Sequence, residues 1–481
     1  MRPETTFASE AECSLIVEQA LYVLETTGMH FGRAKALDVL ADAGARVDRE
    51  AGVARLPREL VESTVARLPR AVLLAGATPA DDCLLEPGRI HFLPSGSPTV
   101  TLDFETGEYR PSTLEDLRHS TIVADAMPPV DILWALVSAT GLPDDGTLLA
   151  EVRAMLAWSG KHIQDDVVAP WQVEPMLAVI EVVCDSLASY RERPRFSYCC
   201  CTTSPLAVGA ELLDASIGVA RYGGPILVYP MPIAGATAPL TVAGAVVINV
   251  AEFLGVATAI ELSAPGSRQI MGVGTSLLDM HATTFSFGAP ETALMCATGV
   301  AVAHYLGVPA LAPALGTDAK YGGIQAGYEK ALKGLMVAAS GADLMTGGIG
   351  ILSGAGIMSL PQIVIDAEMA TMIHRMLDGA EVSAETLQGE AIARRGFKGD
   401  YLKEKDTARR MRAGEVFVPE VASRLSLEAW QAAGDDEAAA AAARVRELIA
   451  AADARGPVLP AETIAQLDAI AAEAETLRPA T

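Results

Sequence analysis

The spacing of apolar residues changes twice along the chain. Over residues 1–75 they recur every three or four positions, and RAKALDVLADAGARVD, residues 33–48, keeps them on one helical face. From residue 74, short β-prone runs separated by glycine, proline and aspartate predict a small β cap that includes RIHFLPSG, residues 89–96. The motif STLEDL that follows has a capping serine or threonine with a carboxylate three positions later, which predicts a helix start. We therefore expect a helical and small β extension over residues 1–128.

From about residue 130 the chain alternates short strand-like apolar runs with longer helical stretches. Some seven or eight such repeats over ~300 residues are typical of a (β/α)8 TIM barrel, with a doubly wound open sheet as the alternative. We expect this α/β barrel over residues 129–414 and an alanine-rich helical tail, packed on the barrel, over residues 415–481. The predicted strands are residues 130–138, 161–168, 195–201, 225–232, 269–276, 309–316 and 342–349.

Charge and hydropathy narrow the classes of partner. The 481 residues include 36 Lys and Arg against 60 Asp and Glu, and the net charge of -24 repels polyphosphate, so no nucleic-acid partner is expected. Two uncharged stretches, residues 222–251 and 292–317, are long enough to span a bilayer. Prolines break both stretches, and Asn249 or His304 would lack polar partners in lipid. We therefore interpret them as buried elements of a soluble protein without a membrane span.

The N-terminus and the cysteines favour a cytoplasmic protein. MRPETTFASEAECS has acids where a secretion signal needs a basic flank and an apolar core. Three of the seven cysteines are consecutive, at residues 199–201, and neighbours on a strand point to opposite faces, so they do not form a disulfide framework. Only Cys199 and Cys201 could share a face, and the seven histidines show no ligand spacing. We therefore expect no directly bound metal.

The glycine-rich run LMTGGIGILSGAGIM, residues 344–358, is close to a nucleotide-binding motif. Its last glycine spacing is one residue too long for G-x-G-x-x-G, and the Gly-Lys-Ser/Thr ending of a P-loop is absent. In a barrel this run would follow a late strand, at the end of the barrel where active sites lie. We interpret its glycines as leaving room for a bulky ligand beside the backbone, and not as a phosphate cradle.

Six blocks of sequence resemble the trimethylamine methyltransferase family, in the same order and over essentially the whole chain. The resemblance implies a TIM barrel that methylates a corrinoid held on a separate small corrinoid protein, which docks over the barrel mouth. The founding archaeal members carry pyrrolysine in a loop after a late strand, where this chain has only ordinary residues in GGIGILSGAGIM. The blocks are LDFETGEYRPSTLEDL (102–117), MPIAGATAPLTVAGA (231–245), TFSFGAPETALM (284–295), GTDAKYGGIQAGYEKAL (316–332), IVIDAEMATMI (363–373) and PEVASRLSLEAW (419–430).

The lack of pyrrolysine favours a quaternary amine as the methyl donor. Protonated trimethylamine is a poor donor to cobalt, whereas a quaternary nitrogen carries a permanent positive charge and departs as a neutral amine when Co(I) attacks its methyl group. The protein would then mainly align the N–CH3 bond with cobalt. We predict a corrinoid-dependent methyltransferase that acts on a glycine betaine-like donor. The alternatives are a trimethylamine methyltransferase and a non-catalytic paralogue that binds methylated amines.

Residues that follow the predicted strands are the candidates for this site. Aromatic rings of Tyr198, Tyr229 and Phe285 would form a cage for the cationic ammonium group. A betaine carboxylate would be bound by His281 or Gln325, with Lys320 as a further candidate. The expected cofactor is the cobalamin-type corrinoid of the partner protein, and a homo-oligomer is common in such families. The catalytic candidates, as negative partners of the cation, are Asp279, Glu291 and Asp318, and the predicted corrinoid-facing loop contains Gly348, Gly350 and Gly354.

Overall fold

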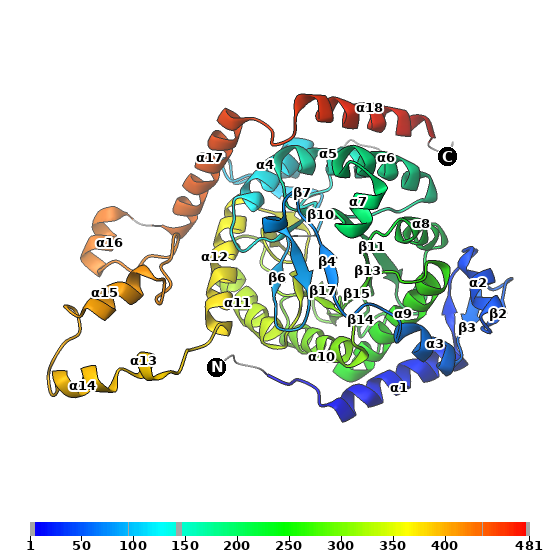
Figure 1. Ribbon diagram of the computed structural model, residues 1–481, viewed down its shortest axis with the longest axis horizontal. Helices are drawn as coiled ribbons and strands as arrows, with labels where there is room; N and C mark the ends of the chain where they lie inside the picture. The colour runs from blue at the N-terminus through cyan, green and yellow to red at the C-terminus, as the bar shows by residue number, and fades with distance from the viewer. Residues whose placement is uncertain (1–4, 95, 141–146, 435, 478–481) are drawn as a thin grey trace.

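Eight short parallel strands form the centre of the molecule (Figure 1). The computed structural model describes residues 5–94, 96–140, 147–434 and 436–477. Within these residues the strands pair in the order β9-β10-β11-β13-β15-β18-β19-β6, and every pair is parallel. Their bounds are β6 His91–Phe92, β9 Ile132–Trp134, β10 His162–Asp165, β11 Phe196–Thr203, β13 Ile226–Tyr229, β15 Gln269–Gly272, β18 Ala310–Pro313 and β19 Leu344–Thr346.

Six of these strands, β9, β10, β13, β15, β18 and β19, lie within the predicted strand-like runs, and β11 begins in its run and extends two residues past it, so these seven positions are confirmed. The eighth strand, β6, lies within RIHFLPSG, which we expected in a separate β cap. That expectation is wrong, because His91 and Phe92 pair in parallel with Leu344 and Met345 of β19. Two residues are too few for the alternation of side chains to indicate which sheet a strand joins.

A single bridge joins the two ends of this strand path. Phe92 of β6 forms an isolated parallel bridge with Val130, and Asp131 N–H donates to the Phe92 carbonyl at 2.9 Å. Both partner residues lie just before β9. We call this contact of Phe92 with Val130 and Asp131 the seam, because a longer ladder is not found there among the described residues. The architecture is thus mixed α/β, with a mostly parallel sheet at its centre.

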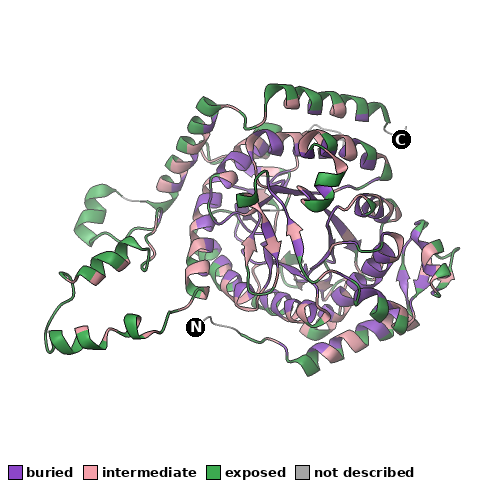
Figure 2. Cartoon of the chain, in the orientation of Figure 1, coloured by how far each residue is buried: buried purple, intermediate pink, exposed green. Residues whose placement is uncertain are grey.

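Helices surround the sheet on its outside, and the strand residues are buried on both faces (Figures 1 and 2). Burial on both faces explains why the strands are continuous apolar runs without alternation. Helix α9 is apolar and long enough to cross a membrane by length and composition, but 78% of its most apolar window is buried, as expected of a core helix. The surrounding helices are α4 Leu114–Asp125, α5 Thr147–Trp158, η2 Pro170–Gln172, α6 Val173–Cys184, α7 Leu187–Glu192, α8 Ala210–Arg221, α9 Val242–Ser263, α10 Pro290–Leu306, α11 Ile324–Ala339 and α12 Leu360–Leu377.

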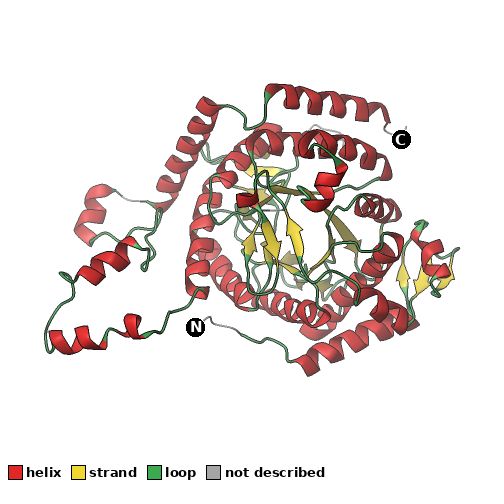
Figure 3. Cartoon of the chain, viewed as in Figure 1, coloured by secondary structure: helices red, strands yellow, loops and turns green. Residues whose placement is uncertain are grey.

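The N-terminal residues place α1, α2, α3 and the strands β1 to β3 against the outside of this ring, while β4 lies over its centre in the view of Figure 1. Helix α1 begins at a capping box between Ser9 and Glu12 and packs on α9 and α10. The capping box predicted in STLEDL is confirmed as Thr113 and Asp116, at the start of α4. Figure 3 shows the peripheral strands of this part beside α2 and α3. The elements are α1 Glu10–Thr26, β1 Met29–His30, α2 Ala36–Asp42, β2 Arg46–Asp48, β3 Val53–Arg55, α3 Arg58–Val65, β4 Val72–Leu74, η1 Pro79–Asp81 and β5 Cys83–Leu85.

Small strands in the loops after the parallel strands form additional sheets. The glycine-rich run continues from β19 into the hairpin β20–β21, and Met358 of β21 pairs with Thr101 of β7. The run is therefore part of a four-stranded sheet, β20-β21-β7-β8. The strands of these sheets are β7 Val100–Leu102, β8 Tyr109–Pro111, β14 Ile233–Ala234, β16 Ser276–Asp279, β17 Thr284–Ser286, β20 Ile351–Leu352 and β21 Ile357–Met358. The short strand β12 Ala207–Val208 instead extends the large sheet, because it pairs with β11 and β1.

The chain after α12 leaves the body as an exposed arm and then returns (Figures 1 and 2). We use the name arm for residues 380–434, which hold four short helices without a buried residue. Helix α17 returns to pack on α12 and α4, and α18 packs on α5 and α6. The helices are α13 Ala384–Leu387, α14 Gly389–Arg395, α15 Lys405–Arg412, α16 Leu427–Ala433, α17 Glu437–Arg455 and α18 Ala461–Leu477.

A buried ion pair fixes the loops that follow β18 and β19. Lys330 of α11 donates to Asp366 of α12 at 2.9 Å, and neither side chain is exposed. The same ammonium donates to the carbonyls of Leu315, Gly348 and Ile351 at 3.0, 2.6 and 2.8 Å. The Asp366 carboxylate in turn accepts the Gly350 N–H at 2.9 Å. Two helices and two loops are therefore joined at one charged centre.

We expect Lys330→Met to lower the free energy of unfolding by about 3–5 kcal/mol, because it leaves a buried carboxylate and three carbonyls without their cation. Denaturant unfolding followed by circular dichroism measures the change. Lys403→Met, in the exposed arm, is the matched control and should change stability by less than about 0.5 kcal/mol. Equal stability of the two variants would contradict this account of the ion pair.

Candidate active site

Aromatic and polar side chains gather inside the curved sheet at the carboxyl ends of β9 to β13. The rings of Trp134 on β9 and Tyr229 on β13 are 6.5 Å apart between centroids, at 53°. Because β10 and β11 lie between these strands in the sheet, the contact crosses the inside of the curve. A Cβ at Gly272 would lie 2.3 Å from the Tyr229 ring, so this glycine of β15 leaves the space that the ring occupies.

The register places polar groups on the same face as these two rings. Gln164 of β10 lies beside Trp134, and Cys201 of β11 lies beside Tyr229. Cys199 shares this face, two residues before Cys201, and the two sulfur atoms are 3.5 Å apart. The prediction that alternate cysteines of the triplet share a face is therefore confirmed. Burial raises the pKa of Cys199 well above its ordinary value, so this residue is a neutral thiol and a weak nucleophile.

Three carboxyl groups lie together at the ends of β9 and β10. Asp165 and Asp166 end β10, and Glu151 of α5 accepts hydrogen bonds from the Ala139 N–H and the Ser138 hydroxyl. Burial, reinforced by the charge of Asp166, raises the pKa of Glu151 to about 7. Burial raises the pKa of Asp166 to about 7 as well, against a contribution from the Cys199 thiol that lowers it. We call Glu151, Asp165 and Asp166 the carboxyl cluster.

The carboxyl cluster is short of positive partners. Burial and the charges of Glu151 and Asp166 raise the pKa of Asp165 as well, so the three groups compete for negative charge. No ion pair of these acids with Lys, Arg or His is found among the described residues. A cation bound nearby would favour their ionised forms, which makes the cluster a suitable site for a positively charged ligand.

Several buried polar atoms around the carboxyl cluster have no hydrogen-bond partner in the described part of the chain. Buried polar groups are nearly always paired, so unpaired atoms concentrated in one place indicate the position of a ligand. Four of these atoms belong to residues in or directly after β9 and β10, and the fifth belongs to Glu151 of α5. The atoms are Trp134 Nε1, Glu151 Oε1, Gln164 Nε2, Asp165 Oδ2 and Asp166 Oδ1.

Of the predicted aromatic cage, only Tyr229 lies in this group. Tyr198 follows Ser197, whose hydroxyl contacts His162 and Gln164 on the inner face, so its ring points the other way and packs beside Tyr190 and Gly224. Phe285 lies on the exposed strand β17, with its ring 6.2 Å from that of Phe287. The structure therefore does not bring the three predicted rings together, and it places Trp134, which the sequence analysis did not single out, opposite Tyr229.

The predicted polar residues lie in the loops after β15 and β18, away from the carboxyl cluster. Asp279 and His281 share an exposed turn, in which the N–H groups of Ala282 and His281 bind the Asp279 carboxylate and hold its pKa below the ordinary value. Glu291 is exposed in the first turn of α10. These positions give no shared site, and the roles assigned to the residues stay predictions.

Asp318 and Gln325 organise the loop that carries β17. Asp318 accepts hydrogen bonds from the Ser286 hydroxyl at 2.5 Å and from the Phe287 N–H at 2.7 Å. Gln325 donates to Glu329 at 2.9 Å, and Glu329 accepts the Asp318 N–H at 2.8 Å. Both predicted residues thus hold the loop between β17 and α10 through hydrogen bonds within the protein.

The glycines of the predicted corrinoid-facing loop do not leave open space. A Cβ at Gly348 would lie 2.3 Å from the Leu315 backbone, and one at Gly350 would lie 2.5 Å from Ile363. A Cβ at Gly354 would meet the Phe285 ring at 3.0 Å. The expectation of room for a bulky ligand is therefore wrong at these positions, because the glycines let neighbouring protein segments approach each other.

The strongest signal missed in the sequence was the triplet Gln164-Asp165-Asp166. Its position after a predicted strand was visible, because active sites of such folds lie where strands end. The sequence did not show that the triplet is buried beside Glu151, since these carboxyl groups come from different elements. Adjacent aspartates at the end of an apolar run are the signal that could have identified the site.

Comparison with known proteins shows which family the chain resembles over its length. The model of the family described as trimethylamine methyltransferase (MTTB) matches residues 1–476. The trimethylamine methyltransferase MttB of Desulfitobacterium hafniense is 30% identical over 426 residues, which cover 89% of this chain and 85% of that protein. The glycine betaine methyltransferase of D. hafniense strain Y51 is 24% identical over 474 residues, 98% of this chain and 97% of the relative.

A solved structure, the monomethylamine methyltransferase MtmB of Methanosarcina barkeri, aligns with 99% of this chain and 96% of its own, at a TM-score of 0.47 and 13% identity. The family match over nearly the whole length, together with relatives that share its full extent, identifies the chain. It belongs to the trimethylamine methyltransferase family.

Proposed function

We propose that the chain transfers a methyl group from a quaternary amine, such as glycine betaine, to the reduced cobalt of a corrinoid carried by a small partner protein. The observation that carries this proposal is the group of unpaired buried atoms at the ends of β9 and β10. Trp134 faces Tyr229 across the curve of the sheet, and it is paired in register with Gln164, which directly precedes the two aspartates of the carboxyl cluster. The family supports methyl transfer from an amine, and one relative bears the name glycine betaine methyltransferase. Trimethylamine is the second candidate donor, because the more similar relatives bear that name.

The strand arrangement supports a (β/α)8 barrel as the scaffold of this site. Eight parallel strands follow one path, and the seam connects the end of that path to its beginning. The carboxyl cluster then lies at the carboxyl end of the barrel, where catalytic residues of this fold are found. The glycine loop gives no open cradle for a corrinoid ring, so we assign the ring no contact there.

The permanent positive charge of the donor would hold it in the site. The ring faces of Trp134 and Tyr229 attract a trimethylammonium group, a contribution of about 0.5–2 kcal/mol. The carboxyl cluster adds a negative field, and because the cation favours ionised carboxylates, donor binding lowers the pKa values of Glu151 and Asp166. Gln164 Nε2 and Trp134 Nε1 are donors without partners, suited to the carboxylate of a betaine.

Methyl transfer then depends on alignment and on loss of charge. The corrinoid supplies a cobalt nucleophile that accepts the methyl group, while the bonding electrons stay on nitrogen, which becomes a neutral tertiary amine. Side chains of the site hold the N–CH3 bond in line and exclude water. The neutral amine is no longer attracted by the ionised carboxyl groups, so it leaves and the donor position is free again.

The proposal extends to the location and the partners of the protein. We propose a cytoplasmic protein that acts with a corrinoid protein and without nucleic acid or membrane. The arm presents exposed apolar side chains, among them Phe397, Leu402 and Trp430, which supports a protein partner or a homo-oligomer.

The purified protein, mixed with Co(I) cobalamin and a methylated amine, should form methylcobalamin from glycine betaine or a related quaternary amine. Absorbance of the cobalamin follows the reaction, and protein-free mixtures are the control. Methylation from trimethylamine alone would replace the donor in this proposal. Absence of transfer from every amine, with a cognate corrinoid protein also present, would favour a non-catalytic binding protein.

Tyr229→Ala should slow methyl transfer and weaken donor binding about 10-fold, because it removes one face of the proposed cage, whereas Tyr229→Phe keeps the ring and most of the activity. Tyr198→Phe is the matched control on the outer face of the sheet. Calorimetric titration with glycine betaine and steady-state rates measure the effects. A Tyr229→Ala protein that is folded and binds the donor normally would remove this ring from the site.

The carboxyl cluster should make stability fall as pH rises. The folded-state pKa of Glu151 is about 7, above its ordinary 4.5, so the stabilising proton is fully held below pH 4.5 and is lost as pH rises through 7. We expect Glu151 to account for a loss of about 2–3 kcal/mol between pH 5 and pH 8. Glu151→Gln should flatten this dependence in denaturant unfolding, and Glu291→Gln, at an exposed site, should not. A steeper dependence in Glu151→Gln would contradict the assignment.

A further inference from the structure

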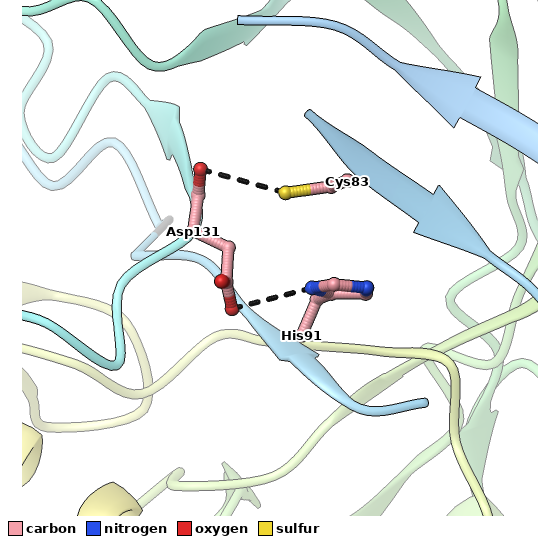
Figure 4. Close-up of side chains that lie close together, drawn as sticks. All are labelled: Cys83, His91 and Asp131. Atoms are coloured by element: carbon pink, nitrogen blue, oxygen red, sulfur yellow. Dashed lines mark hydrogen bonds and ion pairs between the residues drawn. The ribbon is translucent and has the colours of Figure 1, made fainter. Parts of the chain in front are cut away.

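A cysteine, a histidine and an aspartate meet at the opposite end of the sheet from the carboxyl cluster (Figure 4). Cys83 begins β5, His91 begins β6, and Asp131 directly precedes β9. Figure 4 shows the Cys83 thiol and the His91 ring both extending toward Asp131 from neighbouring strands. Because the parallel strands start here, the three residues lie at their amino ends and beside the seam.

The spacing of the three side chains suits a tetrahedral metal ion. One potential ligand atom of each residue lies within 4.8 Å of those of the other two. His91 Nδ1 and Asp131 Oδ2 are 3.5 Å apart. Two nitrogen or oxygen ligands at zinc distances on a tetrahedral centre are separated by about 3.3 Å, and a sulfur and a nitrogen by about 3.6 Å. Because no two of the ligand atoms are more than 4.8 Å apart, binding needs the side chains to approach one another by at most about 1.2 Å.

The His91 side chain is half-buried, and its contact with the Asp131 carboxylate is long for a hydrogen bond, at 3.5 Å. Both ring nitrogens are buried, and neither has a hydrogen-bond partner among the described residues. Among the described residues the Cys83 thiol makes one long hydrogen bond, at 3.8 Å, to the Asp131 carbonyl oxygen. Unpaired buried polar atoms are costly, and a metal ion would satisfy the imidazole and the thiolate together.

Open space beside His91 would allow an ion and a water molecule to approach this residue. His91 lines a cavity of about 550 Å³ that opens between the N-terminal residues and α10, α11 and α12. Two further histidines, His304 and His374, line the same cavity. The ammonium of Lys161 is held nearby by the carbonyls of Ala124, Asp125 and Met127. Its charge partly offsets the burial that raises the pKa of the Cys83 thiol to about 12.

We propose that Cys83, His91 and Asp131 bind a divalent transition metal ion, with zinc as the best match and water as the fourth ligand. Sulfur, imidazole and carboxylate donors in a tetrahedral arrangement are typical of zinc sites. The ion would connect β5, β6 and the chain entering β9, and would so reinforce the seam, where the sheet itself contributes one bridge. Its role is structural, because it lies at the end of the sheet remote from the carboxyl cluster.

This site departs from the sequence-based expectation of no directly bound metal. That expectation was based on short ligand spacings, whereas Cys83 and Asp131 belong to different elements far apart in the chain. The proposal does not depend on methyl transfer, because the two sites occupy opposite ends of the sheet.

The test uses the untagged full-length protein, loaded with zinc and dialysed against metal-free buffer. We expect one equivalent of zinc by elemental analysis and a higher unfolding temperature with zinc than after chelation. Cobalt(II) bound in place of zinc should give a sulfur-to-cobalt charge-transfer band and the strong visible bands of a tetrahedral ion. Cys83→Ala should lose the charge-transfer band, and His91→Gln should lose tight binding.

Cys184→Ala, which removes another buried cysteine outside the cluster, is the matched control and should keep all these signals. If a variant does not fold, cobalt titration of the wild-type protein decides, since its spectrum reports sulfur ligation directly. Less than one tenth of an equivalent of zinc, a cobalt spectrum of an ion bound only by water, or unchanged binding in folded Cys83→Ala would each overturn the proposal.

Discussion

The arrangement of the loops at the carboxyl end of the sheet depends on one buried ammonium group. Lys330 contacts Asp366 and three backbone carbonyls, and these acceptors belong to segments that the sequence separates. A buried ammonium group has no water to solvate it, so hydrogen-bond acceptors of the protein must surround it. The loops after β18 and β19 supply these acceptors and are therefore restricted to one conformation. The glycines of the run after β19 are required by this closeness, since Gly348 lies against Leu315 and Gly350 against Ile363.

Much of the fold could be predicted because its strands are buried on both faces. A parallel strand covered by helices gives an uninterrupted apolar run, and seven of the eight central strands were located in this way. The strand β6 could not be found by the same reasoning, because two residues carry no periodicity. The sequence analysis interpreted the glycine run as leaving room for a ligand, yet the space beside its glycines is filled by neighbouring protein segments, which only the tertiary structure shows.

The candidate site was less predictable than the fold. Tyr229 could be selected because it ends an apolar run, but the same argument selected Tyr198, whose outward direction is set by the alternation of β11. The carboxyl cluster depends on the approach of α5 to the end of β10, and a sequence does not show which helix covers which strand end. Proximity of like charges, more than any motif, distinguishes this end of the sheet.

The seam has a consequence for how the chain reaches its folded state. The strand β6 emerges from the ribosome early, but its hydrogen-bonded neighbour β19 is synthesised roughly 250 residues later, and such long-range contacts slow folding. Until then, the edge of β6 and the apolar end of the growing sheet have no cover. The nascent protein therefore passes most of its synthesis with an open edge, and we expect its dependence on chaperones to be greatest shortly before β19 is complete.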